Sequence, residues 1–133
     1  MDTRTTSAPI TKSISIPVGP IRLEGELELP ENATGLVLFA HGSGSSRHSP
    51  RNQLVARALR SSGIGTLLMD LLTVDEEQSD FDTRQFRFDI ELLAGRLESA
   101  WRWVSETPEA GGLPSGFFGA STGAAAALVA AAR

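Results

Sequence analysis

The spacing of apolar residues changes in character along the chain. In residues Ile10–Val18 and Ile21–Leu29, apolar and polar residues alternate, and this period of two predicts strands with one buried face. A Gly-Pro pair separates the two segments, so we expect an antiparallel hairpin with one solvent-facing side. Residues 1–9 are polar and rich in Ser and Thr, and we expect them to form a flexible tail. One domain is expected to span residues 10–133.

After the hairpin, strand-like and helix-like segments alternate. Short apolar runs predict strands at 36–40, 64–69 and 115–119. Helices are predicted at 49–63, 83–106 and 122–133. The acidic stretch 75–82 is expected to be a solvated loop, and we expect Trp101 in the core and Trp103 to be partly exposed. This order predicts an α/β fold, with a mainly parallel sheet, the antiparallel hairpin at its start and helices on both faces.

Residues Gly119, Ser121 and Gly123 form a Gly-x-Ser-x-Gly pattern between the last predicted strand and the last predicted helix. A strand that turns sharply into a helix strains the middle residue, and side chains two positions away would collide, so glycine is needed there. The Ser121 hydroxyl would then stand above the carboxyl edge of the sheet, near helix amides that include that of Thr122. The pattern predicts a nucleophile, and a tight turn that merely contains serine is the alternative.

A second motif, His-Gly-Ser-Gly at residues 41–44, follows the apolar run 36–40 directly. Phosphate binding is a rival interpretation of such a glycine-rich loop. However, the segment lacks the third glycine of a dinucleotide-binding fingerprint, and no Gly-Lys-Ser/Thr follows it as in a P-loop. We therefore favour a structural role for His41 in orienting this loop. His48 is expected to be a surface or loop-ordering residue.

These two motifs, with a strand ending in Asp70 between them, resemble the α/β-hydrolase superfamily and, within it, the small lidless dienelactone-hydrolase-like enzymes. The resemblance covers residues 10–133. It implies that Ser121 is the nucleophile and that the backbone amides of Ser43 and Thr122 form the oxyanion hole. The elbow and loop glycines that it implies are Gly42, Gly119 and Gly123. The implied activity is hydrolysis of carboxylic esters, lactones or related small acyl compounds through an acyl-enzyme, without a cofactor.

The chain departs from this superfamily after the serine. In this fold the catalytic triad runs in the order Ser, then Asp or Glu, then His. Residues 122–133 contain no acidic residue and no histidine, so the triad acid and base are absent here and the fold is incomplete on its C-terminal side. We interpret the chain as a fragment. A second chain that supplies the missing half, or self-association that covers the open sheet edge, is the alternative.

Without a base, this chain alone is expected to show little or no turnover, because the oxyanion hole by itself supplies only residual catalysis. The second function considered is a non-catalytic, hydrolase-like scaffold used for binding or assembly. The sequence that follows the triad serine would separate the two hypotheses. An acidic residue and a late histidine on short loops favour the enzyme.

Asp70 ends a predicted strand, at the edge where open α/β sheets place their ligands. A turn or capping role is favoured for this residue, and a contact on the substrate side is the alternative. The acidic residues of 75–82 lack the glycine-marked pattern of a calcium loop, so no metal site is expected.

Composition narrows the function classes further. The net charge of −4 and the sequence pI of about 5.1 give no electrostatic footprint for nucleic acid or an acidic membrane. The absence of cysteine excludes disulfides and thiolate catalysis by this chain. The start of the chain lacks the apolar core of a secretory signal, and no apolar run is long enough to cross a bilayer. A cytoplasmic location is therefore expected.

Overall fold

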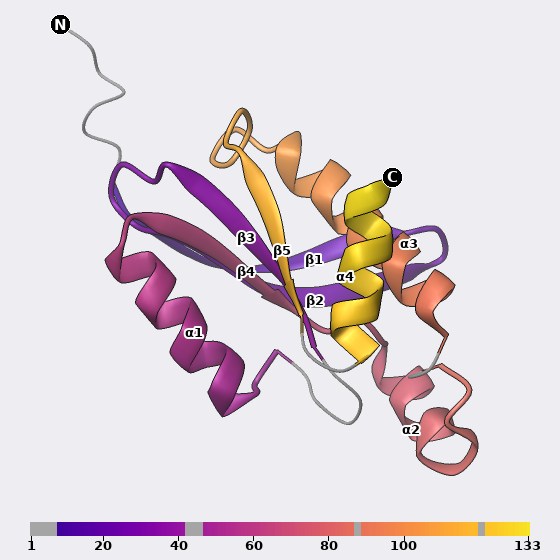
Figure 1. The fold of residues 1–133 in the computed structure, drawn as a ribbon. Helices are drawn as coiled ribbons and strands as arrows, with labels where there is room; N and C mark the ends of the chain where they lie inside the picture. The colour runs from indigo at the N-terminus through magenta and orange to yellow at the C-terminus, as the bar shows by residue number, and fades with distance from the viewer. Residues whose placement is uncertain (1–7, 42–46, 87–88, 120–121) are drawn as a thin grey trace, which may run out of the picture.

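The computed structural model describes residues 8–41, 47–86, 89–119 and 122–133. Five strands form one sheet in the order β1-β2-β4-β3-β5 (Figure 1). The strands are β1 (Ile10–Val18), β2 (Ile21–Leu29), β3 (Gly35–Ala40), β4 (Ile64–Met69) and β5 (Ser115–Gly119). The helices are α1 (Pro50–Ser61), α2 (Val74–Thr83), α3 (Ile90–Ser105) and α4 (Thr122–Ala132). Most of the predicted tail lies outside the described residues.

The sheet is mixed, as the alternation of elements predicts. β1 pairs with β2 and β2 with β4 in antiparallel fashion, whereas β3 lies parallel to both β4 and β5. Because β3, β4 and β5 run in the same direction, their carboxyl ends meet at one edge of the sheet. The α/β fold with a leading antiparallel hairpin is therefore confirmed, including the five strands at their predicted positions.

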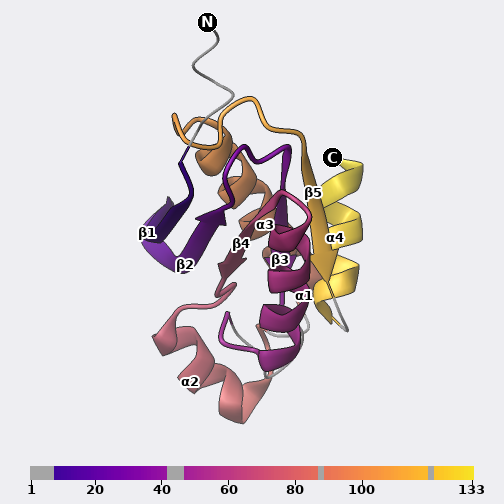
Figure 2. The same cartoon turned by 90° about the vertical axis from the view of Figure 1, so that its left-hand side faces the viewer.

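Helices cover the two faces of the sheet unequally (Figure 2). On one face, α3 and α4 pack together over the larger core, which includes Leu38, Leu67 and Leu97. On the other face, α1 covers a smaller cluster centred on Phe39 and Leu68. The strands β3 and β4 are thus buried on both sides, which is why their sequences are continuous apolar runs.

The face of the hairpin opposite the larger core carries polar residues. Leu23 and Leu27 of β2 are buried, and the glutamates between them lie on the other side of the strand. The Ser15 hydroxyl donates to Glu24 at 2.8 Å across the hairpin, and the Ser13 hydroxyl donates to Glu26 at 3.0 Å. The alternation of apolar and polar residues in the hairpin therefore matches its buried and solvent-facing sides.

Two predictions about the segment between β4 and β5 are wrong. Residues 75–82 are not a loop, because they belong to α2, which a capping box between Thr73 and Glu76 initiates. The helix predicted at 83–106 begins only at Ile90, where the Asp89 side chain accepts from the Leu92 amide. Both errors have the same origin. The acidic composition of 75–82 suggested a loop, and the spacing of apolar residues suggested one long helix from residue 83. The capping residues Thr73 and Asp89, each of which starts a separate helix, were overlooked.

The expected burial is wrong for Trp101 and confirmed for Trp103. Trp101 is 41% exposed, whereas Trp103 is partly buried and packs against the larger core. The buried Ala100 and Val104 set the inward direction of α3 in this turn, and the two tryptophans flank that direction on opposite sides. Their burial therefore depends on what packs beside each of them, and Trp103 is the one that contacts the larger core. In the described parts of the chain, no helix has the length and apolar character needed to span a membrane.

Candidate active site

Three chain segments that carry sequence motifs meet at the carboxyl edge of the sheet. His41 follows β3, Asp70 follows β4, and the turn between β5 and α4 contains the Gly-x-Ser-x-Gly pattern (Figure 1). Of the predicted site residues, Ser121, Gly42 and Ser43 lie outside the described residues. The structure does place the glycines on either side of Ser121, and it places Thr122 in the first turn of α4.

The β5–α4 turn leaves no space for side chains at its two glycines. A Cβ atom at Gly119 would lie 2.4 Å from the Gly123 carbonyl oxygen. A Cβ atom at Gly123 would lie 2.2 Å from the Ala40 carbonyl oxygen and 2.5 Å from that of His41. These distances are far inside van der Waals contact, and the atoms met are backbone atoms that cannot move aside cheaply. The strand thus turns into the helix so tightly that α4 begins directly against the end of β3.

His41 connects the ends of β3 and β4. Its side chain is buried, with the residue only 7% exposed, and its Nε2 atom accepts the Leu71 backbone N–H at 2.8 Å. A backbone N–H can only donate, so Nε2 carries the lone pair and the ring proton sits on Nδ1. This geometry agrees with the structural role favoured for His41 from the sequence.

Asp70 anchors the chain on the far side of the glycine-rich loop. Its Oδ1 atom accepts the Arg47 backbone N–H at 2.8 Å, and its Oδ2 atom pairs with the Arg47 guanidinium. The carboxylate therefore holds Arg47 through both its backbone and its side chain. Desolvation raises the pKa of the nearby Glu77 carboxyl, and the negative charge of Asp70 acts in the same direction.

A buried ion pair that the sequence analysis missed lies behind this edge. Both terminal guanidinium nitrogens of Arg96, Nη1 and Nη2, donate to the Glu76 carboxylate, at 2.5 and 2.6 Å, and Nη1 also donates to the Leu71 carbonyl at 2.8 Å. The hydrogen bonds from Arg96 hold the pKa of the Glu76 carboxyl below its ordinary value of 4.5. The sequence did contain a signal, because Arg96 is a charged residue within the apolar stripe of α3, between Leu93 and Leu97.

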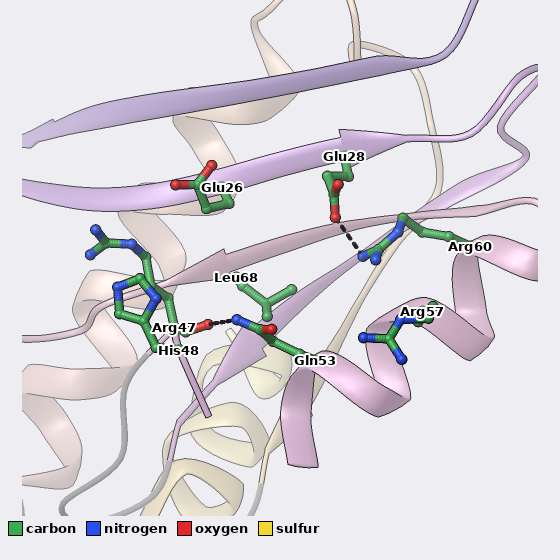
Figure 3. Close-up of a pocket in the computed structure, with 8 residues that line it drawn as sticks. All are labelled: Glu26, Glu28, Arg47, His48, Gln53, Arg57, Arg60 and Leu68. Atoms are coloured by element: carbon green, nitrogen blue, oxygen red, sulfur yellow. Dashed lines mark hydrogen bonds and ion pairs between the residues drawn. The ribbon is translucent and has the colours of Figure 1, made fainter. Parts of the chain in front are cut away.

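A polar cleft of about 160 Å³ lies on the α1 side of the sheet, between that helix and β2 (Figure 3). It is lined by Glu26, Glu28, Arg47, His48, Gln53, Arg57, Arg60 and Leu68. Arg60 pairs with Glu28 at 2.8 Å, and Gln53 Nε2 donates to the Arg47 carbonyl at 3.4 Å. The two glutamates lie on β2 and two of the three arginines lie on α1, so the cleft joins α1 to the hairpin. Its lining carries one more basic than acidic side chain, without counting His48.

The comparison with solved structures decides the fold. The chain superposes on a dienelactone hydrolase from Anabaena variabilis with a TM-score of 0.90 and 55% sequence identity, over 95% of this chain and 58% of that one. It also superposes on an esterase from Pyrococcus furiosus with a TM-score of 0.73 and 18% identity, over 92% of this chain and 45% of that one. The chain has the α/β-hydrolase fold. Its resemblance to the dienelactone hydrolase group is thus confirmed.

The chain also has curated relatives. Two Mycobacterium tuberculosis proteins, from strains CDC 1551 and H37Rv, are each 52% identical to it over 121 residues, and each is named "Putative phosphoribosyl transferase". The match takes in 91% of this chain and 26% of each relative, so the chain spans about a quarter of their length. The sequence matches no protein-family model.

In an α/β-hydrolase, the strand–turn–helix seen between β5 and α4 is where a nucleophile elbow lies. The loop after β3 and the amide that follows the nucleophile are the two sources of oxyanion-hole donors in that fold. Here the described residues next to these two segments, His41 and Gly123, lie in close contact. Within the described residues, no cluster of three or more His, Asp or Glu side chains could hold a metal ion.

Proposed function

We propose that the complete protein containing this chain hydrolyses a carboxylic ester, a lactone or a related acyl compound through an acyl-enzyme on Ser121. The observation that carries the proposal is the packing of Gly119 and Gly123, which forces the β5–α4 turn against the end of β3. That contact brings the first turn of α4 to the loop at His41. The names of the Anabaena dienelactone hydrolase and the Pyrococcus esterase support an acyl substrate.

The proposed reaction has two stages, acylation of the serine and hydrolysis of the acyl-enzyme. The Ser121 hydroxyl oxygen attacks the acyl carbon, and its proton passes to a histidine base. The negative charge that develops on the carbonyl oxygen is stabilised by the backbone N–H groups of Ser43 and Thr122, with the positive end of the α4 dipole behind them. The protonated base then gives its proton to the departing alcohol or enol oxygen. Water, deprotonated by the same base, releases the acid and restores the serine.

In this fold the triad acid and histidine follow the serine in the chain. Residues 122–133 contain no Asp, Glu or His, so we expect both triad residues in a part of the complete protein outside this segment. This chain covers 58% of the Anabaena enzyme, and the uncovered part is where the two residues would lie. The substrate-side role considered for Asp70 remains a secondary hypothesis, since its carboxylate already binds Arg47. Recognition of a particular acyl compound would depend on loops outside this chain.

The first prediction tests the nucleophile. A serine-reactive fluorophosphonate should label the complete protein, and Ser121→Ala should abolish both the labelling and the turnover of p-nitrophenyl acetate. Ser115→Ala is a matched control, because Ser115 is an exposed serine at the other end of β5. Labelling and turnover that survive in Ser121→Ala would refute the proposal. Residues 1–133 expressed alone should show little or no turnover for lack of a base.

The second candidate is a non-catalytic hydrolase-like module within a larger enzyme. It is favoured by the name of the curated relatives, three quarters of whose length lies outside the match. This hypothesis expects the complete protein to fold without reacting with the fluorophosphonate. The absence of an acidic residue and a histidine after the elbow in the complete protein would support it.

A further inference from the structure

A continuous path of hydrogen bonds crosses the molecule behind the carboxyl edge of the sheet. It begins at Glu76 in α2, continues through Arg96 in α3 to the Leu71 carbonyl, and passes from the Leu71 N–H to His41 at the end of β3. Each of its contacts measures 2.5 to 2.8 Å. Leu71 joins the two halves of the path, because Arg96 binds its C=O and His41 accepts its N–H, on either side of one Cα atom.

The centre of this path is a buried charge. The Arg96 side chain is only 8% exposed, and the Glu76 side chain that faces it is 18% exposed. A buried ion pair is weak evidence for stability, because desolvation of the two charges offsets much of their attraction. A well-packed apolar side chain would serve stability as well at this position. The fixed bidentate geometry of the pair does something an apolar residue cannot, since it places Arg96 Nη1 to hold the carbonyl of the Leu71–Leu72 peptide in one orientation.

The far end of the path reaches the candidate active site. His41 receives the Leu71 N–H through its side chain, and its own carbonyl lies where a Cβ on Gly123 would come within 2.5 Å. His41 is therefore held from two sides, by Leu71 and by the first turn of α4. A shift of Leu71 would move His41 against the turn that carries the proposed nucleophile.

We propose that Arg96, oriented by Glu76, is a positioning residue for the active site, acting through Leu71 and His41 to hold the end of β3 against the β5–α4 turn. This inference rests on the proposed function for its catalytic consequence. Its structural part, the fixing of His41 by Arg96, stands independently of that function. Arg96 touches neither substrate nor reacting atoms in this scheme.

The test uses Arg96→Lys and Arg96→Met in the complete protein. Lysine keeps the charge but cannot span both Glu76 and the Leu71 carbonyl, and methionine removes every donor while filling a similar space. Arg102→Met is the matched control, because Arg102 is an exposed arginine on the same helix. Folding is checked by circular dichroism, and kinetics are measured below the unfolding midpoint of each variant. Glu76→Gln is a milder fourth variant, should both Arg96 variants fail to fold.

With p-nitrophenyl acetate, we expect kcat of the Arg96 variants to fall about tenfold to a hundredfold, since a misplaced site loses transition-state stabilisation of this order. KM should change less than about threefold. The inhibition constant of an aryl trifluoromethyl ketone, which forms a tetrahedral oxyanion on serine, should rise by the same factor as kcat/KM falls. A lower unfolding midpoint with unchanged kcat and unchanged ketone affinity would overturn the proposal, because a purely structural tether predicts that result.

Hydrogen exchange provides a readout that needs no activity. The Leu71 amide donates to His41, so its exchange should accelerate at least about tenfold in Arg96→Met relative to Arg102→Met, while α1 amides keep their rates. Unchanged exchange at Leu71 would overturn the inference. If the wild-type protein shows no turnover, the proposed function fails while the exchange result still decides whether Arg96 holds His41.

Discussion

At the scale of single residues, we expect substitutions to be tolerated least where two backbone segments are in close contact. Gly119 and Gly123 differ from the other glycines of the described chain in the backbone that surrounds them. A Cβ atom added at either position would lie 2.2 to 2.4 Å from a carbonyl oxygen of an adjacent element. The pattern of glycines around Ser121 therefore has a packing reason that is independent of chemistry. Gly95, in the middle of α3, has nothing within 4 Å of the same position.

This contrast gives a paired prediction. Gly123→Ala should lower the free energy of unfolding by at least about 2 kcal/mol, because the added methyl group must displace the end of β3. Gly95→Ala should instead raise it by about 0.5–1 kcal/mol, since alanine is the better helix former and the site is open. Urea denaturation of both variants measures the difference. Equal effects of the two substitutions would contradict this account of the turn.

At the scale of elements, α2 is held mainly by polar interactions. The capping box of Thr73 and Glu76 starts the helix, Arg96 ties Glu76 to α3, and the Asp80 carboxylate accepts the Phe86 amide at 2.7 Å. Its outward side chains Val74 and Phe81 are exposed, the latter by 81%. The attachment of α2 therefore depends on the charge of Glu76 more than on apolar burial.

The pKa of Glu76 turns this into a pH prediction. Its folded pKa is below 4.5 because of the hydrogen bonds from Arg96, so its contribution to stability is present above the unfolded pKa and lost as the pH falls through the lowered value. Stability should therefore decline below about pH 4.5, and the decline should be shallower in Glu76→Gln. Unfolding by urea between pH 7 and pH 3 measures both curves. Glu31→Gln, an exposed turn residue, is the control, and parallel curves for all three proteins would refute the assignment.

At the scale of the whole molecule, the described sheet ends in two edge strands, β1 and β5, and β5 is the one that leads into the candidate active site. This strand has five residues, two of them glycine, and its partner among the described strands is β3. A hollow of about 320 Å³ lies beside it, between β5, α3 and α4, and the exposed Trp101 lines that hollow. Unpaired backbone groups at a strand edge are a template for pairing with another chain.

Residues 1–133 expressed alone should therefore self-associate at micromolar concentrations. Gly116→Lys should weaken this association, because a charge on an edge strand opposes pairing and the position is open, with nothing within 4 Å of a built Cβ. Gln78→Lys adds the same charge on the exposed side of α2 and is the matched control. Sedimentation velocity measures the size distribution. A monomer at all concentrations, or equal effects of the two lysines, would contradict the role assigned to β5.

The sequence by itself determined the five strands and most of the helices. β1 and β2 alternate apolar and polar residues because one of their faces is buried, and β3 and β4 are continuous apolar runs because both of theirs are. The bounds of these strands could therefore be predicted to within a residue or so. The Gly-x-Ser-x-Gly pattern located the strand–turn–helix for the same local reason. The break between α2 and α3 was missed because composition outweighed the capping signals at Thr73 and Asp89.

Only the tertiary structure decided which of these segments meet. The order β1-β2-β4-β3-β5 places the end of β3 between β4 and β5, so that His41 touches Leu71 on one side and the first turn of α4 on the other. The Glu76–Arg96–Leu71–His41 path links residues up to 55 positions apart in sequence. No local periodicity encodes such a path, because each contact depends on how separate helices pack around the sheet.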